Sequence, residues 1–157
     1  MRLDYRNVYP DALRAMLELE KAVHASSLEA ELLELVKIRA SQINGCGYCL
    51  DMHTKDAAVM GISDQRIHLV AAWQEAPVYS ARERAALGWC EALTLLPTSG
   101  APDSSYQEAA AVFSPEELVA LSLAIVAING WNRLAVGFRS PVGSYQPPKA
   151  TTHEARS

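Results

Sequence analysis

The chain has 157 residues; half are hydrophobic, a fifth are charged, and the formal net charge at pH 7 is −4. A chain of this length forms a single domain with a core of its own. Its acidic balance and its scattered Lys and Arg residues argue against a nucleic-acid-binding protein.

The compartment can be inferred from the apolar segments and the cysteines. The longest apolar run, Leu118 to Ile128, is too short to span a bilayer, and residues 1–16 lack the apolar core of a signal peptide. We therefore expect a cytoplasmic protein with no membrane partner. In a reducing compartment, three cysteines indicate redox or metal chemistry rather than structural disulfides.

Helix signals recur along the chain, and runs of alternating β-branched residues are absent, which predicts an all-α fold of about six to seven helices. In chain order, the helices are expected over residues 12–25, 28–43, 46–60, 64–73, 81–96, a short one from 104, and 115–138. Capping signals open three of them, at Ser26/Glu29, Ser80/Glu83 and Ser114/Glu117. Pro97 is expected to end the fifth helix, with a loop over 98–102.

The end of the chain differs from the rest in composition. After Ser140 it is polar and rich in proline. We therefore expect one domain over residues 1–140, followed by a flexible tail over 141–157 that is disordered or lies on a partner subunit.

The segment ELVKIRASQINGCGYCLDMH, residues 34–53, contains the residues that could take part in a chemical reaction. Cys46 and Cys49 form a C-x-x-C pair, His53 follows four residues later, and Glu34 precedes Cys46 by twelve. Cys49 and His53 share one helix face, since residues four apart are neighbours on a helix. A helix that starts near Cys46 places both sulfurs at its positive end, which favours thiolate over thiol.

Glu34 can join this group only if the chain reverses direction. On one straight helix it would lie about 18 Å from Cys46. The Asn44-Gly45 pair permits a tight turn. We therefore predict a helix that ends near Ile43 or Asn44, a turn, and a second helix that brings His53 back toward Glu34.

The pattern Glu34-x11-Cys46-x2-Cys49-x3-His53, with Ser41 between, resembles the core motif of the alkylhydroperoxidase AhpD family in the carboxymuconolactone decarboxylase superfamily. The late segment AIVAINGWNRLAVGFR, residues 124–139, resembles the last core helix of that family. The resemblance covers residues 29–138.

This resemblance implies an all-α fold and obligate homo-oligomers, usually trimers or hexamers. It also implies a dithiol peroxidase without a metal or other cofactor, in which Glu34 and His53 relay protons to Cys46 and Cys49. The partners would be a small peroxide and an external dithiol reductant, such as a lipoyl group or a thioredoxin-like protein. Tyr48 stands where the best-known members have a histidine, and a phenol is a poor base near neutral pH.

Three residues are candidates for supporting roles: Tyr48, Ser41 and Arg133, the last of which could pair with a buried carboxylate or with carbonyl groups. Cys49 is the candidate attacking thiol because His53 lies on its helix face, and Cys46 would then resolve the intermediate. The opposite order stays open, since in thioredoxin-like motifs the first cysteine is the nucleophile. Cys90 falls in the apolar register of its helix and is expected in the core.

Several alternatives compete with this interpretation. Without the resemblance, Glu34 would be read as a surface residue paired with Lys37. Cys46, Cys49 and His53 could bind zinc, but a closed structural site needs a fourth ligand. The function could also be a lactone decarboxylase-like acid/base reaction of Glu34 and His53, or a redox sensor without sustained turnover.

Overall fold

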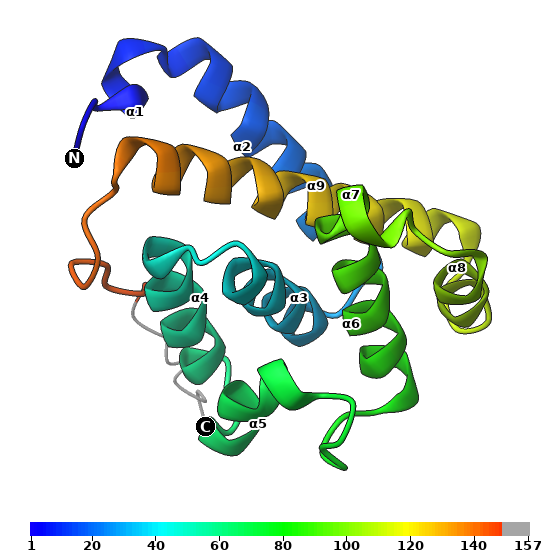
Figure 1. Cartoon of the computed structure of the whole chain (residues 1–157). Helices are drawn as coiled ribbons and strands as arrows, with labels where there is room; N and C mark the ends of the chain where they lie inside the picture. Colours follow the sequence, from blue (N-terminus) through cyan, green and yellow to red (C-terminus); the bar gives the residue numbers. More distant parts are fainter. Residues whose placement is uncertain (149–157) are drawn as a thin grey trace, which may run out of the picture.

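The computed structural model describes residues 1–148, and all regular secondary structure in this range is helical (Figure 1). The predicted all-α class is confirmed. The elements are α1 (Tyr5–Val8), α2 (Pro10–His24), α3 (Ala30–Ile43), α4 (Gly47–Val59), α5 (Asp64–Leu69), the 3-10 helix η1 (Val70–Ala72), α6 (Ala81–Thr94), α7 (Leu96–Ser99), α8 (Asp103–Ala110) and α9 (Pro115–Phe138).

Helix α3 is the centre of the fold. It packs against α4, α6, α9 and η1, while α2 lies along the outer side of α9 (Figure 1). Its side chains enter two apolar clusters: Leu33 packs toward α6 and α9, and Leu35 and Ile38 pack toward α5 and η1. Because α3 is covered on several sides, a polar residue on it is removed from water, and this applies to Glu34.

Helix α9 begins at the predicted capping box. Ser114 Oγ accepts a hydrogen bond from the Glu117 N–H (3.2 Å), and the Ser114 N–H donates to Glu117 Oε2 (2.8 Å). The helix has 24 residues and by length and composition alone could cross a membrane, although the apolar run in the sequence is only eleven residues long. In this fold it packs against α2, α3, α4 and α6, and 39% of its apolar window is buried.

Two helix boundaries differ from the prediction. Ser26 does not cap α3, which begins at Ala30; its hydroxyl instead donates to the Val23 carbonyl (2.6 Å) and closes the end of α2. Pro97 does not lead into a loop, because proline is tolerated in the first turn of a helix and here lies in the first turn of α7.

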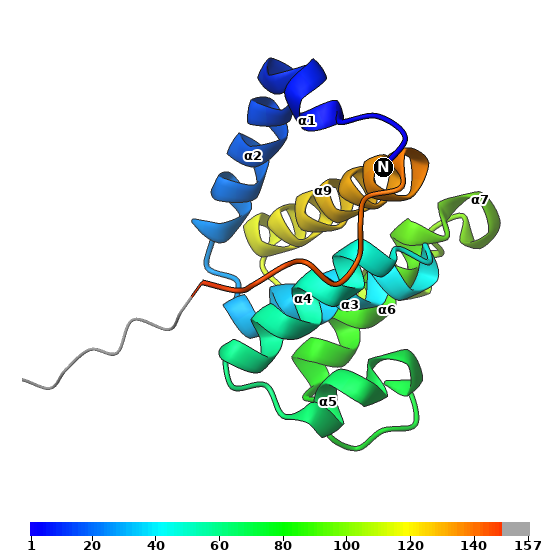
Figure 2. The same ribbon diagram turned by 90° about the vertical axis from the view of Figure 1, so that its left-hand side faces the viewer.

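The predicted tail lies partly on its own chain. Residues 141–148 run along α4 (Figure 2), where the Tyr145 hydroxyl donates to Asp56 Oδ1 (2.7 Å) and Lys55 Nζ donates to the Tyr145 carbonyl (2.9 Å). The Gly143 N–H adds a bond to Asp51 Oδ2 (3.2 Å). The flexibility of this stretch stays a prediction, and the remainder of the predicted tail, 149–157, lies outside the described residues.

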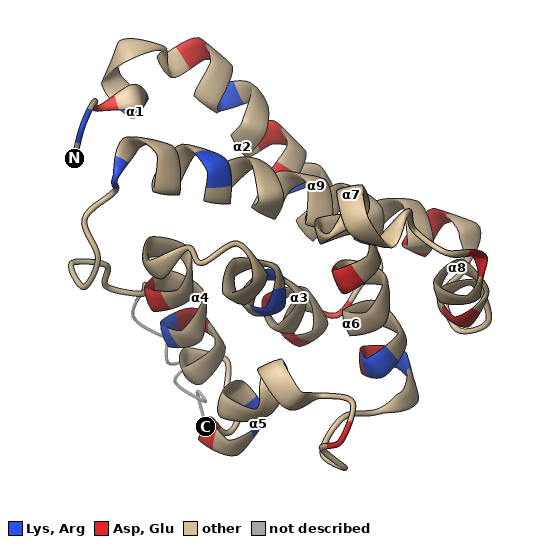
Figure 3. Ribbon diagram, viewed as in Figure 1, with Lys and Arg blue, Asp and Glu red and all other residues tan. Residues whose placement is uncertain are grey.

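Charged residues are spread over the helices. In Figure 3 acidic and basic positions occur together on several helices, such as α2, α4 and α6, rather than gathering in a single basic stretch. The interspersed pattern agrees with the scattering of Lys and Arg in the sequence.

Candidate active site

The predicted chain reversal between α3 and α4 is present. Helix α3 ends at Ile43, Gly45 adopts a left-handed conformation (φ 63°), and α4 begins at Gly47. The two helices then pack side by side, which brings His53 Nδ1 to 2.8 Å from Glu34 Oε2. An acid and an imidazole 19 positions apart in sequence thus form a buried pair.

The two cysteines lie at the start of α4. Cys46 is the N-cap residue, and its sulfur accepts a hydrogen bond from the Cys49 N–H (3.4 Å). The two sulfurs are 2.7 Å apart and both residues are 1% exposed, with free thiols. Sulfurs this close can be converted to a disulfide with little backbone movement.

The proton shared by these sulfurs has a preferred place. The contact with the Cys49 thiol, helped by the Cys49 N–H and opposed by burial, lowers the pKa of Cys46 to about 6. The same contact and burial raise the pKa of Cys49 above its usual range. At neutral pH the pair therefore holds one proton, with the thiolate at Cys46 and the thiol at Cys49.

Thiolate absorbance in the ultraviolet should therefore show one ionisation with a midpoint near pH 6 in the reduced protein. The thiolate fraction rises with pH through this value, because the charged form is the deprotonated one. Cys49→Ala removes the donor thiol, so the midpoint should move up toward the ordinary value of about 8.5. Cys90 contributes nothing below pH 9, since burial raises its pKa to about 12. A wild-type midpoint near pH 8.5 would contradict this assignment.

Glu34 belongs to a larger buried charge network. Lys37 Nζ lies 3.3 Å from Glu34 Oε1, 3.1 Å from His24 Nε2 and 3.5 Å from Glu20 Oε2. Burial by itself would raise the pKa of Glu34, but the hydrogen bond and charge of His53 and the charge of Lys37 together lower it. Glu34 is only 3% exposed, so the reading of Glu34 as a surface residue is wrong.

A second polar group holds the turn in place from α9. The Asn132 amide donates to Ser41 Oγ (3.0 Å) and accepts from Asn44 Nδ2 (2.9 Å), while the Ser41 carbonyl accepts from the Cys46 N–H (2.9 Å). Hydrogen bonding by Asn132 also contributes to lowering the pKa of Cys46, after the larger contribution of Cys49. Ser41 and Asn132 thus lie directly beside the cysteine turn.

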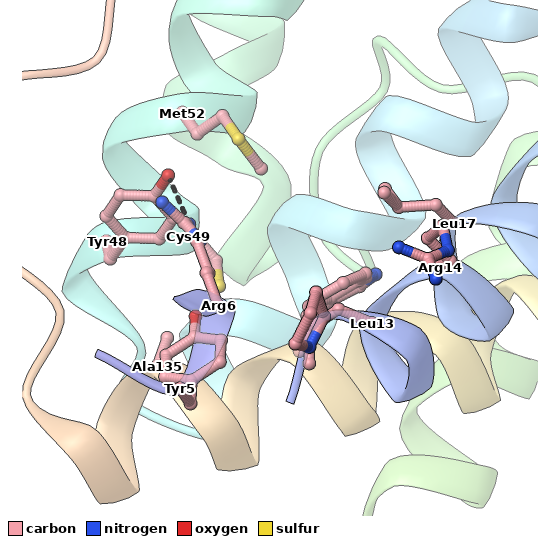
Figure 4. Close-up of a pocket in the computed structure, with 11 residues that line it drawn as sticks. Tyr5, Arg6, Leu13, Arg14, Leu17, Tyr48, Cys49, Met52 and Ala135 are labelled. Atoms are coloured by element: carbon pink, nitrogen blue, oxygen red, sulfur yellow. Dashed lines mark hydrogen bonds between the residues drawn. The ribbon is translucent and has the colours of Figure 1, made fainter. Parts of the chain in front are cut away.

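The two cysteines face different openings. Cys49 lines a cavity of about 490 Å³ between α1, α2, α4 and α9 (Figure 4). Its walls are mostly apolar and include Leu13, Met52 and Trp131. Cys46 lines a smaller groove of about 260 Å³, one wall of which is Val142 from the segment along α4. The side chain of Tyr48 borders both openings.

Residues 10–92 match the carboxymuconolactone decarboxylase family. The chain belongs to this family. It is 40% identical over 143 residues to YdfG of Bacillus subtilis (strain 168), an uncharacterized protein, covering 91% of this chain and 97% of YdfG. ATU0492 from Agrobacterium tumefaciens is 46% identical and has a TM-score of 0.88, covering 92% of this chain and 99% of ATU0492. That protein is of unknown function, and its name suggests an AhpD antioxidant defence protein.

The debrominase Bmp8 shares the fold at 23% identity, with a TM-score of 0.77 over 88% of this chain and 74% of Bmp8. The AhpD-like resemblance expected from the motif is thus confirmed at the level of family and fold. Within this carboxymuconolactone decarboxylase family member, Glu34, Cys46, Cys49, His53, Tyr48 and Ser41 all lie at one site.

Arg133 is not brought to the site. Its guanidinium is exposed and donates to the carbonyl (2.8 Å) and side-chain oxygen (3.0 Å) of Asn129 on the same helix. The predicted pairing of Arg133 with a carbonyl is present. Its hydrogen bonds go to Asn129, so they do not support the expected role at the cysteines. The neighbouring Asn132 instead contacts Ser41 and Asn44 at the cysteine turn. The Asn-Gly-Trp-Asn-Arg segment is the sequence feature that could have indicated Asn132.

The possible metal ligands are not those of the zinc alternative. In the described part of the chain, the donor atoms that cluster within 4.8 Å belong to Glu34, His53 and Asp56, not to the cysteines. Lys37 approaches the other Glu34 oxygen at 3.3 Å. The positive charge of this ammonium group disfavours a metal ion beside Glu34. Glu34 and His53 already form a hydrogen bond with each other.

Proposed function

We propose that the chain is a dithiol peroxidase of the AhpD type that reduces hydrogen peroxide or organic hydroperoxides. The observation that carries the proposal is the sulfur pair at the start of α4, 2.7 Å apart, with one sulfur facing a cavity. A thiolate and a second thiol within bonding reach are the two parts that reversible peroxide reduction requires.

The reaction begins at Cys49, because this sulfur lines the larger cavity. Because the resting pair holds its proton on Cys49, this proton first passes to the Cys46 thiolate, and the minor form with the thiolate at Cys49 attacks the peroxide. A sulfur–oxygen bond forms, the O–O bond breaks, and water or an alcohol leaves with one proton. Cys46 then attacks the Cys49 sulfenic acid, which releases water and leaves a disulfide. The thiols are oxidised by two electrons, and the hydroperoxide is reduced by two.

The Glu34–His53 pair supplies and accepts the protons of these steps. Its buried carboxylate, held by Lys37, orients the imidazole through Nδ1, so proton exchange with the cysteines is assigned to Nε2. The electrostatic interaction with His53 is among the causes that lower the pKa of Cys46, after the larger effect of the Cys49 contact.

An external dithiol must reopen the disulfide. We place its attack at Cys46, through the groove beside Val142, since the larger cavity holds the peroxide. A lipoyl group or a thioredoxin-like protein suits this step, and the cytoplasm is the compartment that keeps such dithiols reduced. A homo-oligomer, trimer or hexamer, would cover exposed apolar residues of α9 such as Val119 and Val126.

Peroxide consumption with lipoamide, thioredoxin and glutathione systems in parallel should reveal sustained turnover with at least one of them. One equivalent of peroxide should remove two of the three free thiols and leave that of Cys90. Oxidised protein that no dithiol system can reduce, or thiols that survive stoichiometric peroxide, would refute the proposal.

The two alternatives give different results in the same experiments. A lactone decarboxylase-like enzyme using Glu34 and His53 would keep its activity after thiol alkylation unless the label fills the cavity. A redox sensor would lose the same two thiols, show no sustained turnover with any reductant, and change its oligomer size.

A further inference from the structure

Arg6 is the charged residue nearest the phenol of Tyr48, and the proposed mechanism gives it no role. Its Nη2 donates to the Tyr48 hydroxyl (2.9 Å), and its guanidinium carbon lies 5.2 Å from the centre of the Tyr48 ring (Figure 4). Among residues 1–148, Arg6 forms no ion pair with a carboxylate, whereas Arg14 at the same cavity is paired with Asp11. Arg6 therefore retains its positive charge and further N–H donors at the site.

The position of Arg6 is fixed by contacts of the N-terminal segment with the end of α9. The Arg2 N–H donates to the Phe138 carbonyl (2.7 Å), and the buried ring of Tyr5 lies 5.3 Å from that of Phe138. The Tyr5 hydroxyl is also 3.5 Å from Ser140 Oγ. With Arg2 and Tyr5 anchored to the end of α9, α1 holds Arg6 over Tyr48.

The hydrogen bond between these two residues has a defined direction. A guanidinium can only donate, so the Tyr48 oxygen accepts, and the phenol O–H remains free to donate elsewhere. That O–H finds no acceptor among residues 1–148 and borders the cavity that Cys49 lines. The charge of Arg6 also reaches Cys49, where it offsets part of the rise in pKa caused by Cys46 and burial.

We infer that Arg6 and Tyr48 form a donor pair that binds the leaving oxygen of the peroxide. When the Cys49 thiolate takes the terminal oxygen of R–O–O–H, the electron pair of the O–O bond passes to the RO oxygen. The Tyr48 O–H donates to this oxygen as its negative charge develops, and the adjacent guanidinium stabilises the charge until a proton arrives to complete ROH. Donors aimed at developing charge act most strongly in the transition state. This inference rests on the proposed peroxidase function.

The leaving-group dependence of the oxidation rate tests it. Single-turnover oxidation of the reduced protein is measured with tert-butyl hydroperoxide and hydrogen peroxide, whose leaving oxygens are strongly basic, and with peracetic acid, which releases weakly basic acetate. Arg6→Gln should slow the first two about 10- to 100-fold and peracetic acid less than about threefold, as expected for loss of a charged donor. Tyr48→Phe should show the same pattern, and the double variant should be no slower than the slower single variant.

Two controls separate the possible causes. Lys21→Gln removes one positive charge from an exposed residue of α2 that pairs with Glu18 outside the cavity, and it should match wild type within about twofold. Alkylation by monobromobimane reports the thiols alone, and Arg6→Gln should change its rate less than about threefold. Equal slowing of all three oxidants, or no slowing of any, would overturn the inference. A wild-type protein that none of the oxidants converts would instead refute the peroxidase function itself.

Discussion

Cys49→Ser is expected to lower peroxide turnover by about a thousandfold or more, because it replaces the attacking sulfur by a hydroxyl that is not ionised near neutral pH. Cys46→Ser should also stop turnover, but after one equivalent of peroxide, with the protein held as a Cys49 sulfenic acid. Mass spectrometry after trapping with dimedone distinguishes the two variants. The adduct should appear at Cys49 in Cys46→Ser and should be absent from Cys49→Ser.

Cys90 is the matched control for these substitutions. Its thiol donates to the Val36 carbonyl (3.4 Å) in the apolar core, far from water, and it faces neither opening of the site. Cys90→Ala should therefore keep most of the turnover. A sulfenic acid found at Cys46 in Cys49→Ser would reverse the order of the two cysteines. Full activity in the Cys46→Ser, Cys49→Ser double variant would exclude the dithiol mechanism.

The chain reversal was predictable because the signals for it are local. The Asn44-Gly45 pair marks a helix end, the four-residue spacing fixes His53 relative to Cys49, and a twelve-residue gap excludes a single straight helix. Packing of α3 against α4 needs no further information once the turn is known. Local signals thus sufficed for the chain reversal, while the choice of Glu34 as the partner of His53 also needed the family resemblance.

The site of the thiolate was harder to predict, since it depends on the first residue of α4. The helix dipole and His53 suggested an activated Cys49. With the helix beginning at Gly47, however, Cys46 is the N-cap and receives both the Cys49 N–H and the Cys49 thiol. A shift of one residue in a helix start decides which sulfur is stabilised, and sequence signals do not locate helix ends so finely.

Groups from the N-terminal helices could not be placed from sequence at all. Helix α1 has four residues, too few for an apolar period, so nothing pointed to Arg6. Glu20 and His24 lie on α2, and they meet Lys37 only because α2 packs along α9 beside α3. Such contacts follow from helix packing, which local patterns do not specify.

Glu34→Gln is expected to destabilise the fold by about 3–5 kcal/mol at pH 7, the usual cost of leaving a buried charge without its partner. The side chains of Glu34 and Lys37 are each 4% exposed, so solvent screens the ammonium little, and Glu20 at 3.5 Å compensates its charge only in part. Urea unfolding at fixed protein concentration measures the change. Lys37→Met should cost a similar amount. The double variant should cost less than the sum, since each single change removes a buried charge partner of the other residue and leaves Lys37 with Glu20 or Glu34 with His53.

The pH dependence of this difference follows from the lowered pKa of Glu34 in the folded protein. Between the folded pKa and the ordinary value of 4.5, the unfolded chain binds more protons at this position. The stabilisation from the Glu34 charge is therefore fully present above about pH 4.5 and is lost as the pH falls through the folded pKa. The difference in unfolding free energy between wild type and Glu34→Gln should become smaller as the pH falls over that interval. A gap that stays constant down to acid unfolding, or additive costs in the double variant, would mean that Glu34 is held by packing and not by its charge.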